Sequence, residues 1–276
     1  MKQPKPTWRL LYTPPSHGAW NMAIDEAILE FAGNGRVPPT LRLFSWLPPC
    51  LSLGFAQPIE DVDLHRLHSR GWDIVRRPTG GRAILHTDEL TYSVCGPYSE
   101  PYLSGGVLES YRNLSQALLM ALEKIGINAD SLANESQLSI ADKNNPVCFE
   151  VPSNYEITVN GKKLIGSAQA RKQAGVLQHG SLPLKGDLTR ILQVLNYPDE
   201  SSRESAGQRL LEHATTVENV LGYAGDWWIA AQAFRQAFNN VLEIELKPMT
   251  LTVEEGQKAM ELYSKKYNHP DWTDKN

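Results

Sequence analysis

The stretch YEITVNGKKLIGSAQ, residues 155–169, decides the fold because it contains two strand-like runs joined by one turn. YEITV alternates apolar and polar side chains, which is typical of a half-buried strand. Asn160-Gly161 follows, and this dipeptide is a strong signal for a two-residue type I′ turn. KKLIGSAQ then returns as the second strand. The sequence therefore predicts an antiparallel β-hairpin here.

Further elements are expected on both sides of this hairpin. Strand-like runs cover residues 40–46, 50–55, 73–77, 90–95 and 176–184. Apolar residues at helical spacing predict a helix at residues 22–31, which Asn21 caps, and a longer one at residues 107–125, which Gly126 ends. Residues 128–146 are rich in Asn, Ser, Asp and Ala, so we interpret them as a surface loop.

The C-terminal third is expected to be mostly helical. Asp187 is placed to cap one helix, and residues 227–241 form another. Capping-box spacing occurs twice, at Thr215 with Glu218 and at Thr252 with Glu255. The tail after Lys265 is polar and is expected to fray. Because strands dominate the middle and helices the flanks, we expect an α+β fold with a mixed, largely antiparallel central sheet flanked by helices.

Composition narrows the classes of protein. The 276 residues, 41% of them hydrophobic, are expected to fold as one domain. Lys and Arg number 27 against 31 Asp and Glu, and this balance argues against a general nucleic-acid binder. The N-terminal stretch resembles neither a secretory signal nor a membrane span, so we expect a cytoplasmic protein. Three widely spaced cysteines predict neither a disulfide framework nor a zinc site.

The densest unusual segment is RRPTGGRAILH, residues 76–86. Two arginines end a strand, and the Gly80-Gly81 pair allows backbone amides to approach a carbonyl, carboxylate or phosphate group. A plain hairpin turn between solvated arginines explains the pattern about equally well. The segment lacks the further glycines and the Lys of a phosphate-binding loop. HExxH and GxSxG are absent from the chain, which argues against a zinc hydrolase and an α/β-hydrolase.

Cys148 differs from the other two cysteines. Cys50 and Cys95 lie in apolar strand patterns, where a thiol behaves as a small hydrophobic side chain. Cys148 follows Asn-Asn-Pro at a loop-to-strand junction, where a side chain can meet a substrate. A nucleophilic thiolate needs a nearby cation, and Lys162 and Lys163 begin the returning strand of the hairpin. Strand alternation allows only one of these two lysines to face inward.

Three ordered motifs carry a resemblance to a known family. RRPTGGRAILHTDELTYSV, NPVCFEVPSNYEITVNGKKLIGSAQ and VLQHGSLPL together resemble the biotin and lipoate protein ligase superfamily. The likeness is strongest to its octanoyltransferase branch of the Bacillus type and covers nearly the whole chain. It implies a single catalytic domain over residues 1–276, with the family core at about 35–250.

The resemblance also implies a reaction. In this branch an octanoyl group passes from octanoyl-acyl carrier protein to an enzyme cysteine, and then to a lysine of the glycine-cleavage H protein or another lipoyl domain. The acyl-carrying cysteine falls on Cys148 and its activating lysine on Lys163. Because a thioester is already activated, no cofactor and no metal are expected for the transfer. Nucleic acid and membrane are not expected as partners.

The family's substrate-binding positions fall on three strands and turns of this sequence. The resemblance places substrate contacts at Arg76, Arg77, Gly80, Gly81, Arg82, His86, Gly166, Ser167, Ala168, Gln169, Gln178, His179 and Gly180. Two positions depart from common family patterns. Arg82 stands where ATP-dependent ligases commonly have a third glycine, which counts against adenylate binding. Thr87 separates His86 from Asp88, which many relatives have adjacent.

Three other functions stay open. An ATP-dependent lipoate or biotin ligase would require ATP and magnesium and would leave Cys148 incidental. An amidotransferase would move octanoyl between lipoyl domains rather than from acyl carrier protein. A protein that only binds acyl carrier protein or lipoyl domains would keep the fold without the chemistry, so substitution of Cys148 would leave its partner binding unchanged.

Overall fold

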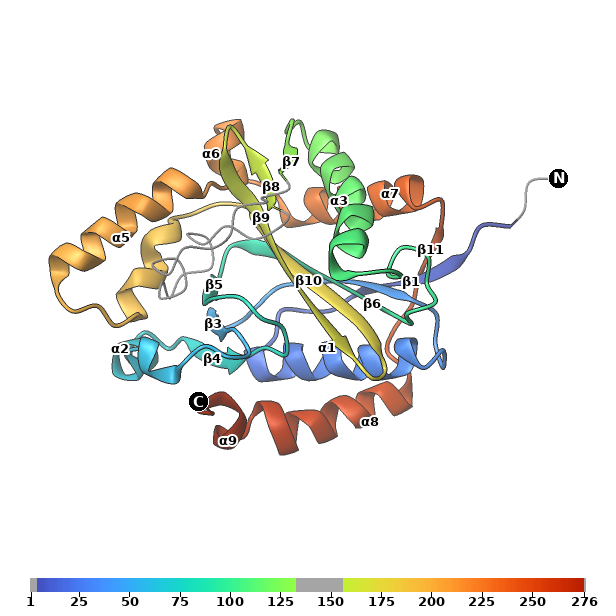
Figure 1. Cartoon of the computed structure of the whole chain (residues 1–276), viewed down its shortest axis with the longest axis horizontal. Helices are drawn as coiled ribbons and strands as arrows, with labels where there is room; N and C mark the ends of the chain where they lie inside the picture. The colour runs from blue at the N-terminus through green and yellow to red at the C-terminus, as the bar shows by residue number, and fades with distance from the viewer. Residues whose placement is uncertain (1–3, 133–155, 276) are drawn as a thin grey trace.

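A large twisted sheet forms the centre of the computed structural model, which describes residues 4–132 and 156–275 (Figure 1). Its eight strands run in the order β11-β1-β2-β6-β10-β9-β8-β7. The pairs β11-β1 and β1-β2 are parallel and the other five are antiparallel. The prediction of an α+β fold with a mixed, largely antiparallel sheet is therefore confirmed. The strands of this sheet are β1 (Thr7–Tyr12), β2 (Thr40–Phe44), β6 (Glu89–Gly96), β7 (Asp130–Leu132), β8 (Glu156–Val159), β9 (Lys162–Lys172), β10 (Gly175–Pro183) and β11 (Glu245–Pro248).

Helices cover both faces of this sheet. Helix α1 (Gly18–Gly33) packs on β6 and β10, and α8 (Val253–Leu262) lies beneath α1 (Figure 1). Helices α3 (Val107–Lys124) and α7 (Trp227–Val241) pack together on the opposite face. The largest apolar cluster lies under α3 and α7, and it includes Leu118, Phe234 and Phe238. Burial of both sheet faces explains why β6 and β10 are buried along their whole length.

A smaller sheet stands beside the large one. It has the order β4-β3-β5 and consists of β3 (Cys50–Leu53), β4 (Asp73–Arg76) and β5 (Ile84–His86). The short helix α2 (Leu64–Ser69), the 3₁₀ segments η1 (Ile59–Asp61) and η3 (Leu188–Val194), and helix α5 (Glu200–His213) adjoin it, and most of them contribute to a separate apolar cluster. The remaining segments are α6 (Val217–Leu221), the π-helical turn η4 (Tyr263–Tyr267) and α9 (Pro270–Thr273).

The local turn and capping signals give mixed results. Asn160 and Gly161 have φ values of 51° and 77°, as a type I′ turn requires, so the predicted hairpin is present. The capping box of Thr252 and Glu255 is confirmed in full. The box expected at Thr215 is wrong by one residue, since the cap of α6 is Thr216. Thr215 is committed elsewhere, because its backbone N–H donates to the carbonyl of Lys163 at 3.0 Å.

Three other expectations are wrong for tertiary reasons. Asn21 lies inside α1, which begins at Gly18, because its amide donates to the carbonyls of Ser16 and Ser45. In the loop expected at residues 128–146, residues 130–132 form strand β7, which pairs with β8, and residues 133–146 lie outside the described residues. The tail after Lys265 is packed instead of frayed, and Tyr267 is only 1% exposed.

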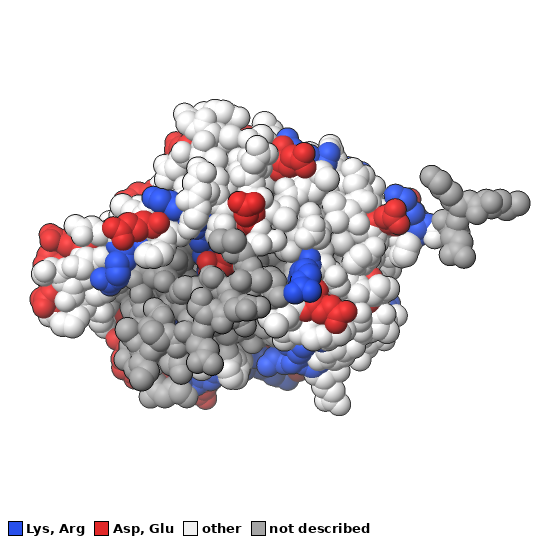
Figure 2. Space-filling model, turned by 45° about the horizontal axis from the view of Figure 1, so that its top comes forward, with Lys and Arg blue, Asp and Glu red and all other residues white. Residues whose placement is uncertain are grey.

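The surface carries charges of both signs. On the face shown in Figure 2, basic and acidic residues are interspersed over the described part of the molecule. None of the helices in the described ranges combines the length and apolar character needed to cross a membrane.

Candidate functional site

The turn after β4 is held by Arg77. Its guanidinium donates to the carbonyl of Gly80 at 2.9 Å and to that of Arg82 at 2.7 Å, and also to the backbone and hydroxyl of Ser52. The left-handed φ of 93° at Gly81 suits glycine. Gly80 is exposed, with open space where a Cβ would stand. The sequence motif is therefore a braced turn whose tip is accessible, and Arg77 faces inward where a plain turn would have left it solvated.

Arg76 points away from this turn. Its guanidinium donates to the carbonyls of Gly54 and Gln57, and to those of Trp272 and Thr273 at the C-terminal end. These bonds join the small sheet to α9, which accounts for the full burial of Arg76. The predicted substrate contact of Arg76 stays a prediction, and the residue lies outside the lining of the cavity described next.

An inner cavity of about 20 Å³ lies between the small sheet and the large one. It brings together six of the predicted site residues. The lining consists of Met22, Trp46, Ser52, Arg77, Ile84, His86, Thr91, Gly166, Ala168, His179, Gly180 and Ser181. The cavity wall is mostly apolar, with polar atoms contributed by hydrogen-bonded side chains.

His86 is fixed on three sides in this wall. Its Nε2 lies 2.7 Å from the Ser52 hydroxyl, its Nδ1 lies 2.8 Å from Glu89 Oε1, and its ring stacks on Trp46 with centroids 4.1 Å apart. Burial acts to raise the pKa of Glu89, but the His86 charge and hydrogen bonds from His86, Thr91 and Ser181 outweigh it, so this pKa is lowered. Glu89 therefore stays an acceptor that orients the His86 ring.

His179 occupies a parallel arrangement. Its Nε2 lies 2.7 Å from the Thr79 hydroxyl and its Nδ1 lies 3.5 Å from Asp25 Oδ2. Burial lowers the pKa of His179, and the neighbouring Asp25 only partly offsets this effect. Asp25 in turn accepts from Arg42 at 2.7 Å. The His179 ring is thus held between the Thr79 hydroxyl and the Asp25 carboxylate.

The pleat of β9 and β10 divides the predicted site residues between two faces. Gly166 and Ala168 line the inner cavity, whereas Ser167 and Gln178 line a second cavity of about 10 Å³ beneath α3. Gln178 donates to the Tyr92 hydroxyl and accepts from Gln169, both at 3.0 Å. Burial raises the pKa of Tyr92 to about 12, so its hydroxyl stays protonated. Gln169 also donates to the hydroxyl of Ser110 on α3 at 3.0 Å, so this network positions β9 against α3.

Lys163 is buried at the start of β9. It is 2% exposed, and its Nζ lies 2.8 Å from Oε1 of Glu156, which lines the second cavity. Lys162 is exposed and donates to the carbonyl of Leu211. The structure therefore selects Lys163 as the inward-facing lysine of the pair.

The three cysteines are distributed as follows. Cys50 and Cys95 are fully buried free thiols, and burial raises the pKa of each well above its ordinary value. Neither is suited to nucleophilic attack at neutral pH. Cys148, the predicted acyl-carrying residue, lies outside the described residues.

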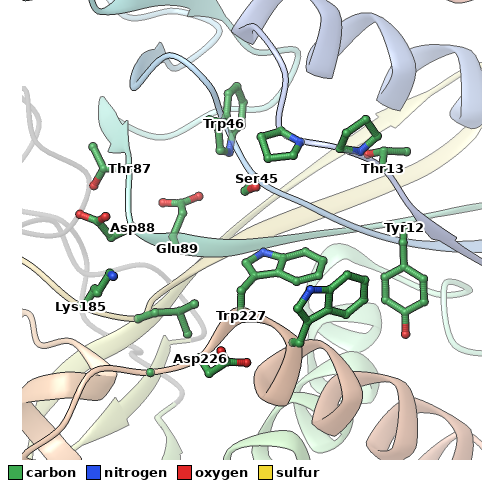
Figure 3. A pocket seen from close by; sticks show the side chains of 15 residues that line it. Tyr12, Thr13, Ser45, Trp46, Thr87, Asp88, Glu89, Lys185, Asp226 and Trp227 are labelled. Carbon is green, nitrogen blue, oxygen red and sulfur yellow. The ribbon is translucent and has the colours of Figure 1, made fainter.

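An outer groove of about 620 Å³ opens on the other side of Trp46 (Figure 3). Tyr12, Trp227 and Trp228 form an aromatic wall, and Asp88, Lys185 and Asp226 lie around its edge. Asp88 is ion-paired with Arg190 at 2.7 Å. Because Trp46 lines both spaces, its indole separates the outer groove from the inner cavity.

Comparison with known proteins shows the family of this chain. The sequence profile of the lipoyl protein ligase A/B catalytic domain matches residues 17–242. The chain belongs to this family. It is 41% identical over 269 residues to octanoyltransferase LipM of Kyrpidia tusciae, covering 96% of this chain and 98% of that protein. Octanoyltransferase LipM of Geobacillus kaustophilus is 38% identical over 275 residues, with 97% and 98% covered.

Solved structures of the family share the fold. A bipartite lipoate protein ligase from Thermoplasma acidophilum superposes with a TM-score of 0.80 at 25% identity, covering 97% of this chain and 96% of that one. A lipoate-protein ligase A structure bound with ATP gives 0.78 at 25% identity, with 97% and 98% covered. Together with the octanoyltransferase relatives, these matches confirm the predicted family and the prediction of an acyltransferase enzyme.

Several residues of this lipoyl ligase-type site were not expected from the sequence. Ser52, Glu89, Asp25 and Thr79 orient the two histidines, yet each lies in an ordinary strand, helix or turn pattern. Glu156 had a detectable signal. In an antiparallel hairpin closed at Asn160-Gly161, Lys163 stands opposite Thr158, and Glu156 is then its diagonal neighbour on the same face.

Proposed function

We propose that the chain is an octanoyltransferase of protein lipoylation that carries the acyl group on Cys148. The observation that carries the proposal is the similarity of 38–41% identity over nearly the full length to octanoyltransferases LipM. The donor is octanoyl-acyl carrier protein, and the acceptor is a lysine of a lipoyl domain such as the glycine-cleavage H protein. The single catalytic domain spans residues 1–276, and the reaction takes place in the cytoplasm.

The first half-reaction forms the acyl-enzyme. The Cys148 thiolate attacks the thioester carbonyl, a new C–S bond forms, and the pantetheine C–S bond breaks. The departing pantetheine thiolate takes up a proton. Lys163 supports this step as a buried cation, since a nearby ammonium favours a thiolate and stabilises an oxyanion. The inner cavity has a mostly apolar wall but a volume of only about 20 Å³, room for about one water, so it must widen to hold an octanoyl chain.

The second half-reaction releases the acyl group. The acceptor lysine enters as a neutral amine, its nitrogen forms a bond to the carbonyl carbon, and the C–S bond to Cys148 breaks. The amine loses one proton and the Cys148 thiol is regenerated. Because an amide is more stable than a thioester, the transfer is downhill without ATP.

Intact-protein mass spectrometry tests the proposal. Purified protein is mixed with octanoyl-acyl carrier protein without ATP, and wild type is compared with Cys148→Ala and with Cys95→Ala as a buried-thiol control. We expect wild type and Cys95→Ala to gain the mass of one octanoyl group and to lose it when H protein is added. Cys148→Ala should gain none. Transfer that occurs only with free octanoate and ATP would refute the proposal and support an ATP-dependent ligase.

A further inference from the structure

The β8–β9 hairpin contains a buried ion pair beside the second cavity. Lys163 Nζ and Glu156 Oε1 are 2.8 Å apart, and their side chains are 2% and 11% exposed. Lys163 pairs across the hairpin with Thr158, so Glu156, two residues before Thr158, lies on the same face. Such diagonal neighbours are about 7 to 8 Å apart at Cα, a distance that a lysine side chain spans.

The backbone around Lys163 is fixed independently of this pair. The type I′ turn at Asn160 and Gly161 sets the hairpin register, and the Lys163 carbonyl accepts from the N–H of Thr215 at 3.0 Å. The register shifts between Thr158 and Ile157, so that Ile157 pairs with Ile165. Such an irregularity bends the strand and changes the direction of the side chains that follow. With the backbone held, the direction of the ammonium depends on the groups that it bonds, and Glu156 is one of them.

Burial and charge act on Lys163 in opposite directions. Removing an ammonium from water favours the neutral amine, whereas a carboxylate within hydrogen-bonding distance favours the charged form. Buried ion pairs add little net stability compared with apolar residues of similar size. Removing only the carboxylate, however, leaves the ammonium buried without its charge partner, so it affects the stability of the fold as well as the charge and direction of Lys163.

We propose that Glu156 is a positioning residue that keeps Lys163 charged and oriented for acyl transfer. This inference rests on the proposed function, because it assigns Lys163 the role of activating cation. Glu156 acts through its ion pair with Lys163, whose Nζ lies 2.8 Å from Oε1. Its effect on the reaction passes through the ammonium of Lys163.

Other titratable groups surround the pair. Asp130 on β7 lies opposite Thr158 and is exposed. Tyr111 on α3 lines the same cavity as Glu156. Glu212 and His213 end α5 near the bridge between Lys163 and Ala214, and both are exposed. Water screens the exposed groups strongly, so the buried carboxylate at 2.8 Å outweighs these exposed groups of the described residues.

The test measures the reactivity of Cys148 against pH. The rate of alkylation by iodoacetamide, assigned to Cys148 by peptide mass spectrometry, is followed across the range in which thiols titrate, together with octanoyl-adduct formation. The alkylation midpoint is the pH at which the alkylation rate is half its maximum. In Glu156→Gln we expect this midpoint to rise by about one pH unit. Adduct formation at neutral pH should fall about tenfold, in line with the smaller thiolate fraction.

Two further variants separate charge from stability. Glu156→Asp keeps the carboxylate one methylene further away, so its midpoint should lie between those of wild type and Glu156→Gln. Glu255→Gln breaks another buried ion pair, with Arg9 at 2.6 Å, on a different face of the sheet. It should lower stability and leave the Cys148 midpoint unchanged.

The outcomes distinguish this inference from the proposed function. If wild type forms no octanoyl adduct without ATP, the proposed function fails. If wild type forms the adduct but Glu156→Gln keeps the wild-type midpoint and rate, the role of Glu156 is refuted and the proposed function stands. Should Glu156→Gln not fold, an unchanged midpoint in Glu156→Asp refutes the role of Glu156 in the same way.

Discussion

Gly54→Ala should damage the site by displacing the Gly80-Gly81 turn. A Cβ on Gly54 would lie 1.8 Å from the carbonyl oxygen of Gly81, and ordinary contact begins at 3.4 Å. The turn would have to retreat by about 1.6 Å. Because the position of a Cβ is set by its own backbone and its partner is a backbone oxygen, no side-chain rotation can relieve the contact.

The loss in the free energy of unfolding can be estimated from the hydrogen bonds that hold this turn. A shift of this size lengthens the bonds from Arg77 to the carbonyls of Gly80 and Arg82, now 2.9 and 2.7 Å. Losing one charge-assisted hydrogen bond costs about 1.5 to 3 kcal/mol, and overpacking alone costs about 1 to 3 kcal/mol. We expect a loss of about 3 kcal/mol in the free energy of unfolding, which lowers the melting temperature by roughly 5 °C for a chain of this size.

Gly80→Ala is the matched control. No atom lies within 4 Å of a Cβ built there, so its melting temperature should match that of wild type. Calorimetry gives the melting temperature, and intact-mass acylation gives the activity. Reduced acylation in a fully stable Gly80→Ala protein would show that the substrate approaches this turn closely. A Gly54→Ala protein as stable as wild type would refute the steric argument.

Three further results are expected. Burial lowers the pKa of His179, so the unfolded chain takes up a proton near pH 6.5 that the folded chain does not, and stability is lost as pH falls through about 6.5. The free energy of unfolding, measured with urea at about pH 7 and about pH 5.5, should show this loss, which is at most about 1.4 kcal/mol per pH unit. His179→Gln should reduce the loss. An equal loss in wild type and in His179→Gln would contradict the assignment to His179. Glu255→Gln removes the charge partner of the fully buried Arg9, so it should lower the free energy of unfolding, measured with urea, by about 3 to 5 kcal/mol. A loss below about 1 kcal/mol would contradict this expectation. Arg76→Lys cannot reproduce the fork of bonds to Gln57 and Thr273, so it should lower the free energy of unfolding by about 2 kcal/mol or more. It should also expose the C-terminal end to cleavage by trypsin. Unchanged proteolysis would show that Arg76 does not hold the C-terminal end.

Elements with a strong local signal could be predicted from the sequence. The Asn160-Gly161 turn requires positive φ at two successive residues, which few dipeptides tolerate, and the predicted helix at residues 227–241 has the bounds of α7. Strand β7 has only three residues and no pattern of its own, and it forms because β8 offers it an edge. Caps failed at Asn21 and Thr215 because distant backbone groups engage these residues.

The site was predictable in part, for a similar reason. The motifs marked six of the residues that line the inner cavity. They did not show that Arg76 faces the C-terminal end instead, since adjacent arginines on a strand point to opposite sides and the motif does not say which side is inward. The partners of His86 and His179 come from separate elements, so no spacing in the sequence marks them.

By itself the sequence determined the hairpin, the fold class and the family resemblance, because these depend on turn chemistry, periodicity and ordered motifs that are local to the chain. Strand alternation alone left the choice between Lys162 and Lys163 open, and the tertiary structure shows that Lys163 is buried and forms an ion pair with Glu156. It also decided which faces of β9 and β10 look into the inner cavity. These features depend on strand register and on packing between segments far apart in the sequence, where burial makes the position of each charge costly to change.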